Sequence, residues 1–252
     1  MSLAQLERTL KLDIKAALGC TEPITIALAA CKAKRLTEGR TSRINLKLST
    51  NLLKNAMEVG IPGTGGQRGI PLAAALGCYS PATEPGMTLL EGMTADWLQQ
   101  AREFVDRDLV DIELVPDKHG LFVEACVADD SGNSARCIIQ GSHENCVLLE
   151  QNGNTIFKSD NTGDSGSGQL LKERQALAST SFADIWNNIR DLSPELRQRM
   201  LNGITMNLKV AEAGMGKDGF LKIGNIYREL MQQGWLGNDV INEAKALTSA
   251  AV

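Results

Sequence analysis

The sequence predicts an α+β protein, and three observations support this fold class. Apolar residues recur at helical spacing near the N-terminus, apolar and polar residues alternate through the middle of the chain, and the last third is helical in period throughout. Residues 1–160 are expected to form an α+β domain with a substrate cleft, and residues 170–252 a helical segment that begins a domain and looks truncated. Between them, residues 161–169 are rich in Gly and Ser, which is typical of a flexible linker.

Two helices are predicted at the start of the chain. The first covers residues 3–18 and ends at Gly19, and the second continues as an apolar helix to Lys34. Thr21 or Glu22 can cap this second helix, and Pro23 suits its first turn. Cys20 then faces the unpaired N–H groups of a helix start, which predicts a lowered pKa for its thiol.

Five strands are predicted in the middle of the chain. Residues 42–50 alternate as a half-buried strand, and the four later runs are separated by turn residues, so they are expected to form a meander. These four runs are residues 110–115, 121–128, 135–140 and 146–150. Further helices are expected over residues 70–76 and 94–106, and after the linker from Ser193 to Gly214, then near 220–233 and 238–249.

Charge and composition exclude several classes of protein. The formal net charge is −4, and no Lys/Arg run is present, which argues against a nucleic-acid or anionic-membrane surface. The N-terminus lacks the apolar core of a signal peptide, so the expected location is the cytoplasm, with no membrane association. The six cysteines are expected to be reduced, and none forms a Cys-x-x-Cys pair.

Several polar residues are candidates for binding a small molecule. The glycines of residues 63–69 allow backbone N–H groups to approach a carboxylate or a phosphate, although a tight turn explains them equally well. Asn51, Lys54 and Asn55 follow a strand, where side chains can project into a cleft. His143 lies in a glycine turn and is a candidate for function, whereas His119 is expected to be solvated.

Several sequence blocks follow one another in a fixed order along the chain. The segment from Ala16 to Ile24, which reads Ala-Ala-Leu-Gly-Cys-Thr-Glu-Pro-Ile, is followed by residues 51–55 and by two glycine-containing segments at 61–65 and 69–77. Together with residues 141–145 and 216–224, these blocks resemble the serine dehydratase alpha-chain-like family, and within it the L-cysteine desulfidase branch. Family members continue for well over a hundred residues more, so the resemblance implies the N-terminal portion of such an enzyme, as a split subunit or a truncated gene.

The resemblance implies α,β-elimination of L-cysteine to pyruvate, ammonia and sulfide, with L-serine as the alternative substrate. It implies catalytic roles for Cys20 and His143, with Cys20 as the base or as a residue associated with a [4Fe-4S] cluster. The remaining cluster ligands would lie outside this chain, so the chain alone is expected to bind no cluster and to be inactive. The substrate-binding residues expected on this basis are Glu22, Asn51, Lys54, Asn55, Thr64 and Gly65.

A noncatalytic binding or assembly module remains the competing interpretation. The expected partners are a small amino acid and either a separate C-terminal subunit or a second copy of the chain, because the surface that the missing portion would cover should be apolar.

Overall fold

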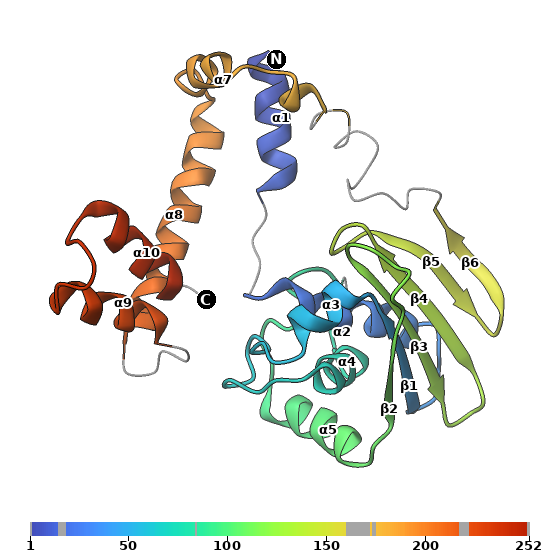
Figure 1. Cartoon of the computed structure of the whole chain (residues 1–252). Coiled ribbons are helices and arrows are strands. Elements are labelled where there is room, and N and C mark those ends of the chain that lie inside the picture. Colours follow the sequence, from blue (N-terminus) through green and yellow to red (C-terminus); the bar gives the residue numbers. More distant parts are fainter. Residues whose placement is uncertain are drawn as a thin grey trace. The chain divides into compact units, whose positions relative to one another are not determined.

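The computed structural model describes residues 2–14, 19–83, 85–159, 172, 175–216 and 222–250 (Figure 1). It confirms the α+β fold class. The chain divides into two compact units, one of residues 15–175 and one that joins residues 1–14 to residues 176–252. Within the described ranges, none of the helices is long and apolar enough to cross a membrane. The expected linker at residues 161–169 lies outside the described residues.

A mixed sheet forms the framework of the first unit. Its strands are β1 (Thr41–Leu48), β2 (Val110–Leu114), β3 (Phe122–Asp129), β4 (Ser134–Gln140), β5 (Cys146–Gln151) and β6 (Asn154–Lys158). They lie in the order β2-β1-β3-β4-β5-β6, with β2 parallel to β1 and the other neighbours antiparallel.

The expected meander is therefore wrong at its first strand. Residues 110–114 pair in parallel with β1 at the edge of the sheet, and the meander runs from β3 through the additional strand β6. The segment between β1 and β2 contains α3 (Thr50–Ala56), α4 (Ile70–Cys78) and α5 (Ala95–Asp106), which provide the long crossover that a parallel pair requires.

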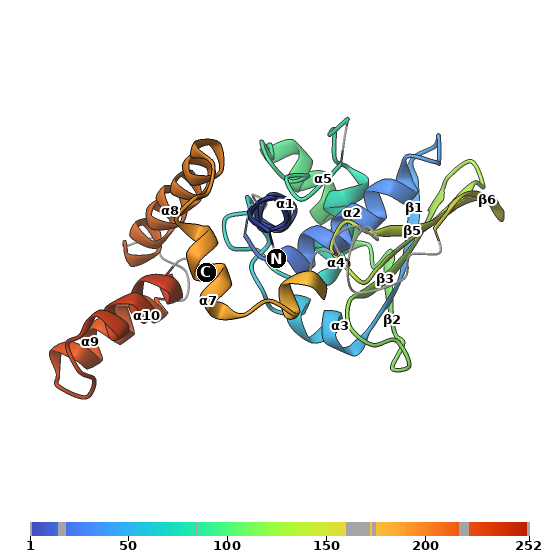
Figure 2. The same ribbon diagram turned by 90° about the horizontal axis from the view of Figure 1, so that it is seen from above.

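Helices cover one face of this sheet (Figures 1 and 2). The helix α2 (Thr21–Lys34) packs on β3, β4 and β5, α4 packs beside α2, and α5 packs on α4. Ten residues of α2 are buried, which explains why its sequence is apolar on nearly every side rather than amphipathic. The opposite face of the sheet is polar, with ion pairs such as Arg43 to Asp111 and Arg136 to Glu150.

The helical unit contains the helices α1 (Leu3–Asp13), α7 (Phe182–Ile189), α8 (Pro194–Met215), α9 (Ile223–Gln232) and α10 (Val240–Ala250). The sequence predicts that residues 1–160 form one domain, but the first 14 residues belong to the helical unit. Within this unit, Leu6 packs with Leu192 and Leu196 in a small separate core. The first helix also ends earlier than expected, since Ile14 already has an extended backbone. Ser193 caps α8 as expected, with its hydroxyl accepting from the backbone N–H of Leu196.

Candidate functional site

Cys20 occupies the N-cap position of α2, whereas the sequence predicts Thr21 or Glu22 as the cap. The Cys20 side chain makes no capping hydrogen bond. The preceding Gly19 has a φ of +146°, and a Cβ there would lie 3.1 Å from the ring of Pro62. Glycine is therefore required at this position both by the backbone conformation and by the close approach of the loop that contains Pro62. This contact places the glycine loop of residues 60–69 beside the start of α2.

Glu22 is the centre of a hydrogen-bonded cluster at this helix start. Its Oε2 accepts from Sγ of Cys20 at 3.0 Å and from the hydroxyl of Thr21 at 3.2 Å. Its Oε1 accepts from Nδ2 of Asn55 at 3.3 Å. The structure thus brings together three of the residues expected at the site, namely Cys20, Glu22 and Asn55, and it links α2 to α3 through the carboxylate.

The expectation of a lowered Cys20 pKa is wrong. Burial, together with the hydrogen bond to the Glu22 carboxylate, raises the pKa of the Cys20 thiol to about 11. The backbone N–H groups at the helix start do favour the thiolate, but they are outweighed. For Glu22, burial opposes ionisation, yet hydrogen bonds led by that from Cys20 lower its pKa overall. At neutral pH the proton therefore stays on the sulfur, and Glu22 carries the charge.

His143 faces the same end of α2 from the turn between β4 and β5. Its Nδ1 lies 2.8 Å from the hydroxyl of Thr25, and this hydroxyl donates to the carbonyl of Thr21, also at 2.8 Å. Because a hydroxyl has only one hydrogen, it must accept from His143, so Nδ1 carries the ring proton. The lone pair of Nε2 is then available to accept a proton, and no hydrogen bond joins Nε2 to a described residue.

The protonation of His143 follows from its surroundings. Burial lowers the pKa of the imidazole, against the opposing charges of Glu22 and Glu144. The ring is therefore neutral at pH 7, with a free basic nitrogen. A neutral imidazole with one nitrogen fixed by a hydrogen bond is the usual form of a general base in enzymes.

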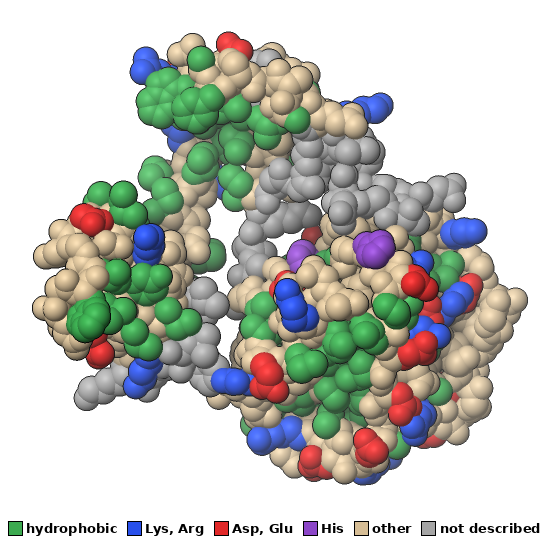
Figure 3. All heavy atoms as spheres, viewed as in Figure 1, with side chains coloured by type: hydrophobic (Ala, Val, Ile, Leu, Met, Phe, Trp, Pro, Cys, Tyr) green, Lys and Arg blue, Asp and Glu red, His purple; other side chains and the backbone are tan. Residues whose placement is uncertain are grey.

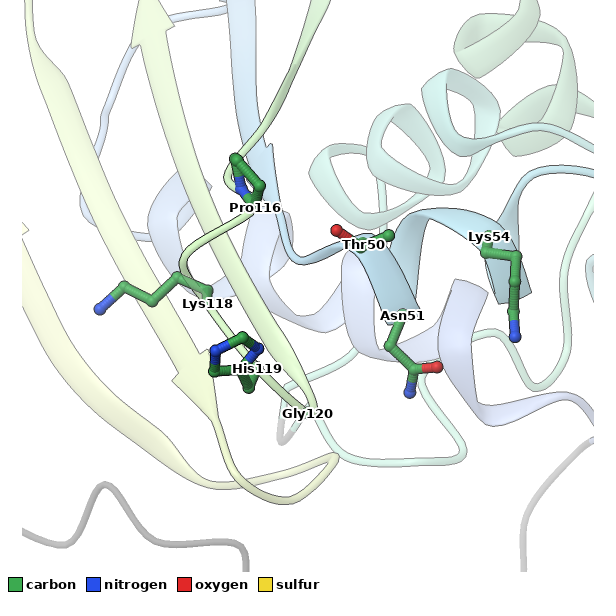
Figure 4. Close-up of a pocket in the computed structure, with 7 residues that line it drawn as sticks. All are labelled: Thr50, Asn51, Lys54, Pro116, Lys118, His119 and Gly120. Atoms are coloured by element: carbon green, nitrogen blue, oxygen red, sulfur yellow. The ribbon is translucent and has the colours of Figure 1, made fainter.

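A pocket of about 220 Å³ lies beside α3 (Figure 4). Asn51 and Lys54 of the expected polar set line it, and they do so from a helix rather than from a loop. Asn55, the third member, does not line it and donates to Glu22 instead. The remaining lining residues are Thr50, Pro116, Lys118, His119 and Gly120. Lys54 and Asn51 point to the same side in Figure 4, and a small anion would find an ammonium group and an amide there.

His119 also lines this pocket, although its sequence context predicts only a solvated side chain. The turn of residues 116–120 reaches α3 because β2 and β3 flank β1, and the hydroxyl of Ser49 donates to the carbonyl of Gly120 at 2.7 Å. The sequence signal for this approach is weak, since it depends on the parallel pairing of β2 with β1.

Thr64 and Gly65 lie in the glycine loop. The Thr64 hydroxyl donates to the carbonyl of Ile61 at 2.7 Å and accepts from the backbone N–H of Gln67 at 3.0 Å. This buried hydroxyl closes the loop. Gly65 is exposed, with a φ of +69° that suits glycine. Of the two, Gly65 offers its backbone to a ligand, whereas Thr64 holds the loop in shape.

The donor set of the described residues does not fit an iron–sulfur cluster. Such clusters are held by several cysteine thiolates. Within the ranges that the structure describes, no group of three or more His, Cys, Asp or Glu side chains is placed to hold a metal ion. Cys20 has Glu22 as its neighbour instead of a second thiol.

The chain is similar to curated proteins of several organisms. It is 34% identical over 235 residues to a UPF0597 protein of Nitratidesulfovibrio vulgaris, a match that covers 93% of this chain and 52% of the relative. It is 30% identical over 242 residues to a UPF0597 protein of Clostridioides difficile, covering 96% of this chain and 56% of the relative. A UPF0597 protein of Clostridium perfringens is 34% identical over 247 residues, covering 97% of this chain and 55% of the relative.

The chain thus spans about half the length of the curated relatives that it matches. No family model matches the sequence. The names of these relatives state no activity, so the resemblance to the serine dehydratase alpha-chain-like family stays a prediction.

Proposed function

We propose that this chain is the substrate-binding and proton-transferring portion of an amino-acid lyase that eliminates the thiol of L-cysteine. The observation that carries the proposal is the neutral imidazole of His143, held through Nδ1 by Thr25 with its Nε2 lone pair available, beside the charged carboxylate of Glu22. The resemblance of the sequence blocks supports the same reaction.

The charges of the site suit a zwitterionic amino acid. The ionised Glu22 is a partner for the substrate ammonium group, and Asn55 holds this carboxylate in place. Lys54 and Asn51 stand on the same short helix as Asn55 and suit the substrate carboxylate.

In this scheme His143 removes the Cα proton at Nε2. The electron pair of the Cα–H bond forms the Cα–Cβ double bond, and the Cβ–S bond breaks with sulfur leaving as hydrosulfide. The aminoacrylate then hydrolyses to pyruvate and ammonia. The high pKa of Cys20 makes its thiol a hydrogen-bond donor rather than the base proposed from the sequence. Because the described residues do not fit a cluster, no step is assigned to one.

Substrate binding can be measured on the chain itself by following backbone amide resonances during titration with L-cysteine, L-serine and L-alanine. We expect shifts confined to α3, the loop of residues 60–69 and the turn of His143, with L-alanine as the ligand that lacks a leaving group. Lys54→Met should weaken binding about tenfold through loss of one charge pair. His143→Gln should leave binding nearly unchanged, since it removes only the base.

Three outcomes would change this proposal, each in a different part. If no amino acid shifts these residues, the substrate cleft is wrong and the assembly module is favoured. Anaerobic treatment with iron and sulfide should leave this chain colourless and inactive, so a four-iron spectrum with turnover on the chain alone would contradict the proposal that the ligands lie elsewhere. If L-serine binds and L-cysteine does not, the alternative serine lyase replaces the cysteine lyase.

The second candidate function is assembly with a partner polypeptide, which the helical unit supports. Large apolar side chains lie exposed on it, among them Phe182 at 78%, Trp235 at 78% and Val240 at 83% (Figure 3). Apolar surface of this kind marks a protein interface. We infer that it packs against a polypeptide equivalent to the remaining length of the relatives, with a second copy of the chain as the alternative. Sedimentation of the chain alone distinguishes the two, because only the second gives a dimer.

A further inference from the structure

We propose that Cys137 and Cys146 form a dithiol site that reacts reversibly with small disulfides and closes into an intramolecular disulfide. The two residues lie on the adjacent antiparallel strands β4 and β5, with their Sγ atoms 3.8 Å apart. The ladder is irregular between Ile138 and Ile139, where Ile139 pairs with Cys146. This site is independent of the proposed lyase activity and uses neither Cys20 nor His143.

The two thiols differ in access. Cys137 is fully buried on the face of the sheet that packs against α2, whereas Cys146 at the start of β5 is half-buried. A disulfide molecule therefore reaches Cys146 first. The buried Cys137 is shielded from direct attack and can react only with what is attached to its neighbour.

The electrostatics reinforce this division. The hydrogen bond from Cys137 lowers the pKa of Cys146 to about 7, against the opposing effect of burial, and the charge of Lys32 favours the thiolate as well. The hydrogen bond to Cys146 raises the pKa of Cys137, because the Cys137 proton is shared with the neighbouring sulfur. Burial and the charge of Cys31 also raise the pKa of Cys137. Cys146 is thus the nucleophile, and Cys137 is the thiol that resolves.

The other cysteines lack this combination. Burial, assisted by neighbouring Glu22 and Glu124 respectively, raises the pKa values of Cys20 and Cys126 to about 11. At pH 7 such a thiol is ionised in roughly one molecule in ten thousand. Cys31 and Cys78 are buried. Cys146 is therefore expected to react well before the other five.

The chemistry balances with a low-molecular-weight disulfide as the oxidant. The Cys146 thiolate attacks one sulfur of glutathione disulfide, forms a mixed disulfide and releases one glutathione thiolate. Once Cys146 is capped, its negative charge no longer raises the pKa of Cys137. Cys137 then loses its proton, attacks Sγ of Cys146 and expels the second glutathione. Two protein thiols are oxidised and one disulfide is reduced to two thiols.

The experiment treats the full reduced chain with glutathione disulfide at pH 7 and follows the products by mass spectrometry after acid quenching. We expect a species two mass units lighter, whose proteolytic digest contains the peptides of Cys137 and Cys146 joined. Added dithiothreitol should restore both thiols. A trivalent phenylarsenical, which requires two neighbouring thiols, should also bind the untreated chain at this pair.

Single variants separate the two roles. Cys137→Ala should accumulate a stable glutathione adduct on Cys146, because nothing displaces it. Cys146→Ser should give neither an adduct nor a disulfide on Cys137 over the same time. The matched control is Cys126→Ser, which lies on the neighbouring strand β3 and should behave as the parent chain does. Unfolding curves of each variant show whether the fold is kept.

Two results would overturn the proposal. One is a persistent glutathione adduct on Cys146 in the parent chain, which would show that Cys137 cannot reach it. The other is labelling of Cys146 no faster than that of Cys20 and Cys126, measured on the parent chain without any substitution.

Discussion

The thiol of Cys20 donates to the carboxylate of Glu22 across 3.0 Å, so the helix start that should create a thiolate instead holds a protonated sulfur. The favourable contribution of a helix dipole reaches about 2 kcal/mol in the best geometries. Here, burial and the carboxylate act against it together. The charge that a ligand meets at this end of α2 is therefore negative, which suits an ammonium group.

Glu22→Gln should lower the pKa of Cys20, because it removes the charge that disfavours the thiolate while keeping a side chain of the same size. Burial remains, so we expect alkylation of Cys20 by iodoacetamide at pH 8.5 to become about five to ten times faster. The rate at Cys126 is the internal control, since its pKa is also about 11 but its acidic neighbour is Glu124. An unchanged rate at Cys20 would show that burial alone sets its pKa.

Thr25→Val should change the tautomer of His143. The hydroxyl of Thr25 fixes the ring proton on Nδ1, and valine has nearly the same shape without the acceptor. Nitrogen NMR should show the Nδ1-protonated form in the parent chain and a shift towards the Nε2-protonated form in the variant. The chain contains only two histidines, so His119 provides an internal reference that should not change. A parent chain already protonated at Nε2 would remove the basis for His143 as the base.

The position of Cys20 could be predicted from the sequence, but its pKa could not. The signals for a helix start are local, since Gly19 and Pro23 constrain the backbone directly. The pKa depends on how Glu22 folds back and on Asn55, which comes from another helix. Interactions between distant segments of this kind leave no periodic signal in a single sequence.

The pairing of strands in the sheet was likewise beyond what the sequence alone could predict. Alternation correctly indicates a strand within residues 42–50, where β1 lies, because it reports one buried and one polar face. It does not report the partner of a strand, and the parallel pairing of β2 with β1 depends on the crossover through α3, α4 and α5. Likewise, the stripe containing Leu6 predicts a helix but not that it packs against Leu196, far along the chain.

Asp129→Asn should destabilise the first unit at neutral pH and remove part of its acid sensitivity. The buried carboxylate accepts from the backbone N–H groups of Gly39, Ser131 and Asn133, and from the side chain of Asn133. Burial opposes its ionisation, but these hydrogen bonds lower its pKa to about 2 from the ordinary 3.8. A lowered pKa means that the folded state binds the proton less tightly, so this stabilisation is present above pH 4 and is lost as the pH falls towards 2.

The measurement is the difference in free energy of unfolding between the parent chain and Asp129→Asn, from urea curves at pH 7, 4 and 3. Fluorescence of the buried Trp97 reports on the first unit when the exposed Trp186 and Trp235 are replaced by phenylalanine in both proteins. We expect the difference to be constant from pH 7 to about 4 and to shrink below it. A difference independent of pH over this range would mean that the carboxylate charge is not its source.

Gly77→Ala should destabilise the packing of α4 against α2. A Cβ at Gly77 would lie 2.0 Å from the carbonyl oxygen of Ala27, a backbone atom that cannot turn aside. Overpacking of this kind costs about 1–3 kcal/mol, whereas alanine gains only about 0.5–1 kcal/mol in a helix, so we expect a net loss of about 1 kcal/mol in the free energy of unfolding. The Trp97 fluorescence described above is a direct reporter, because its indole donates to the carbonyl of Leu76 at 2.9 Å.

Gly60→Ala is the matched control, since its Cβ would meet nothing within 4 Å, and it should leave the unfolding curve nearly unchanged. Equal stability of Gly77→Ala and the parent chain would show that α2 and α4 can separate at no cost, contrary to the close approach of the two helices in this structure.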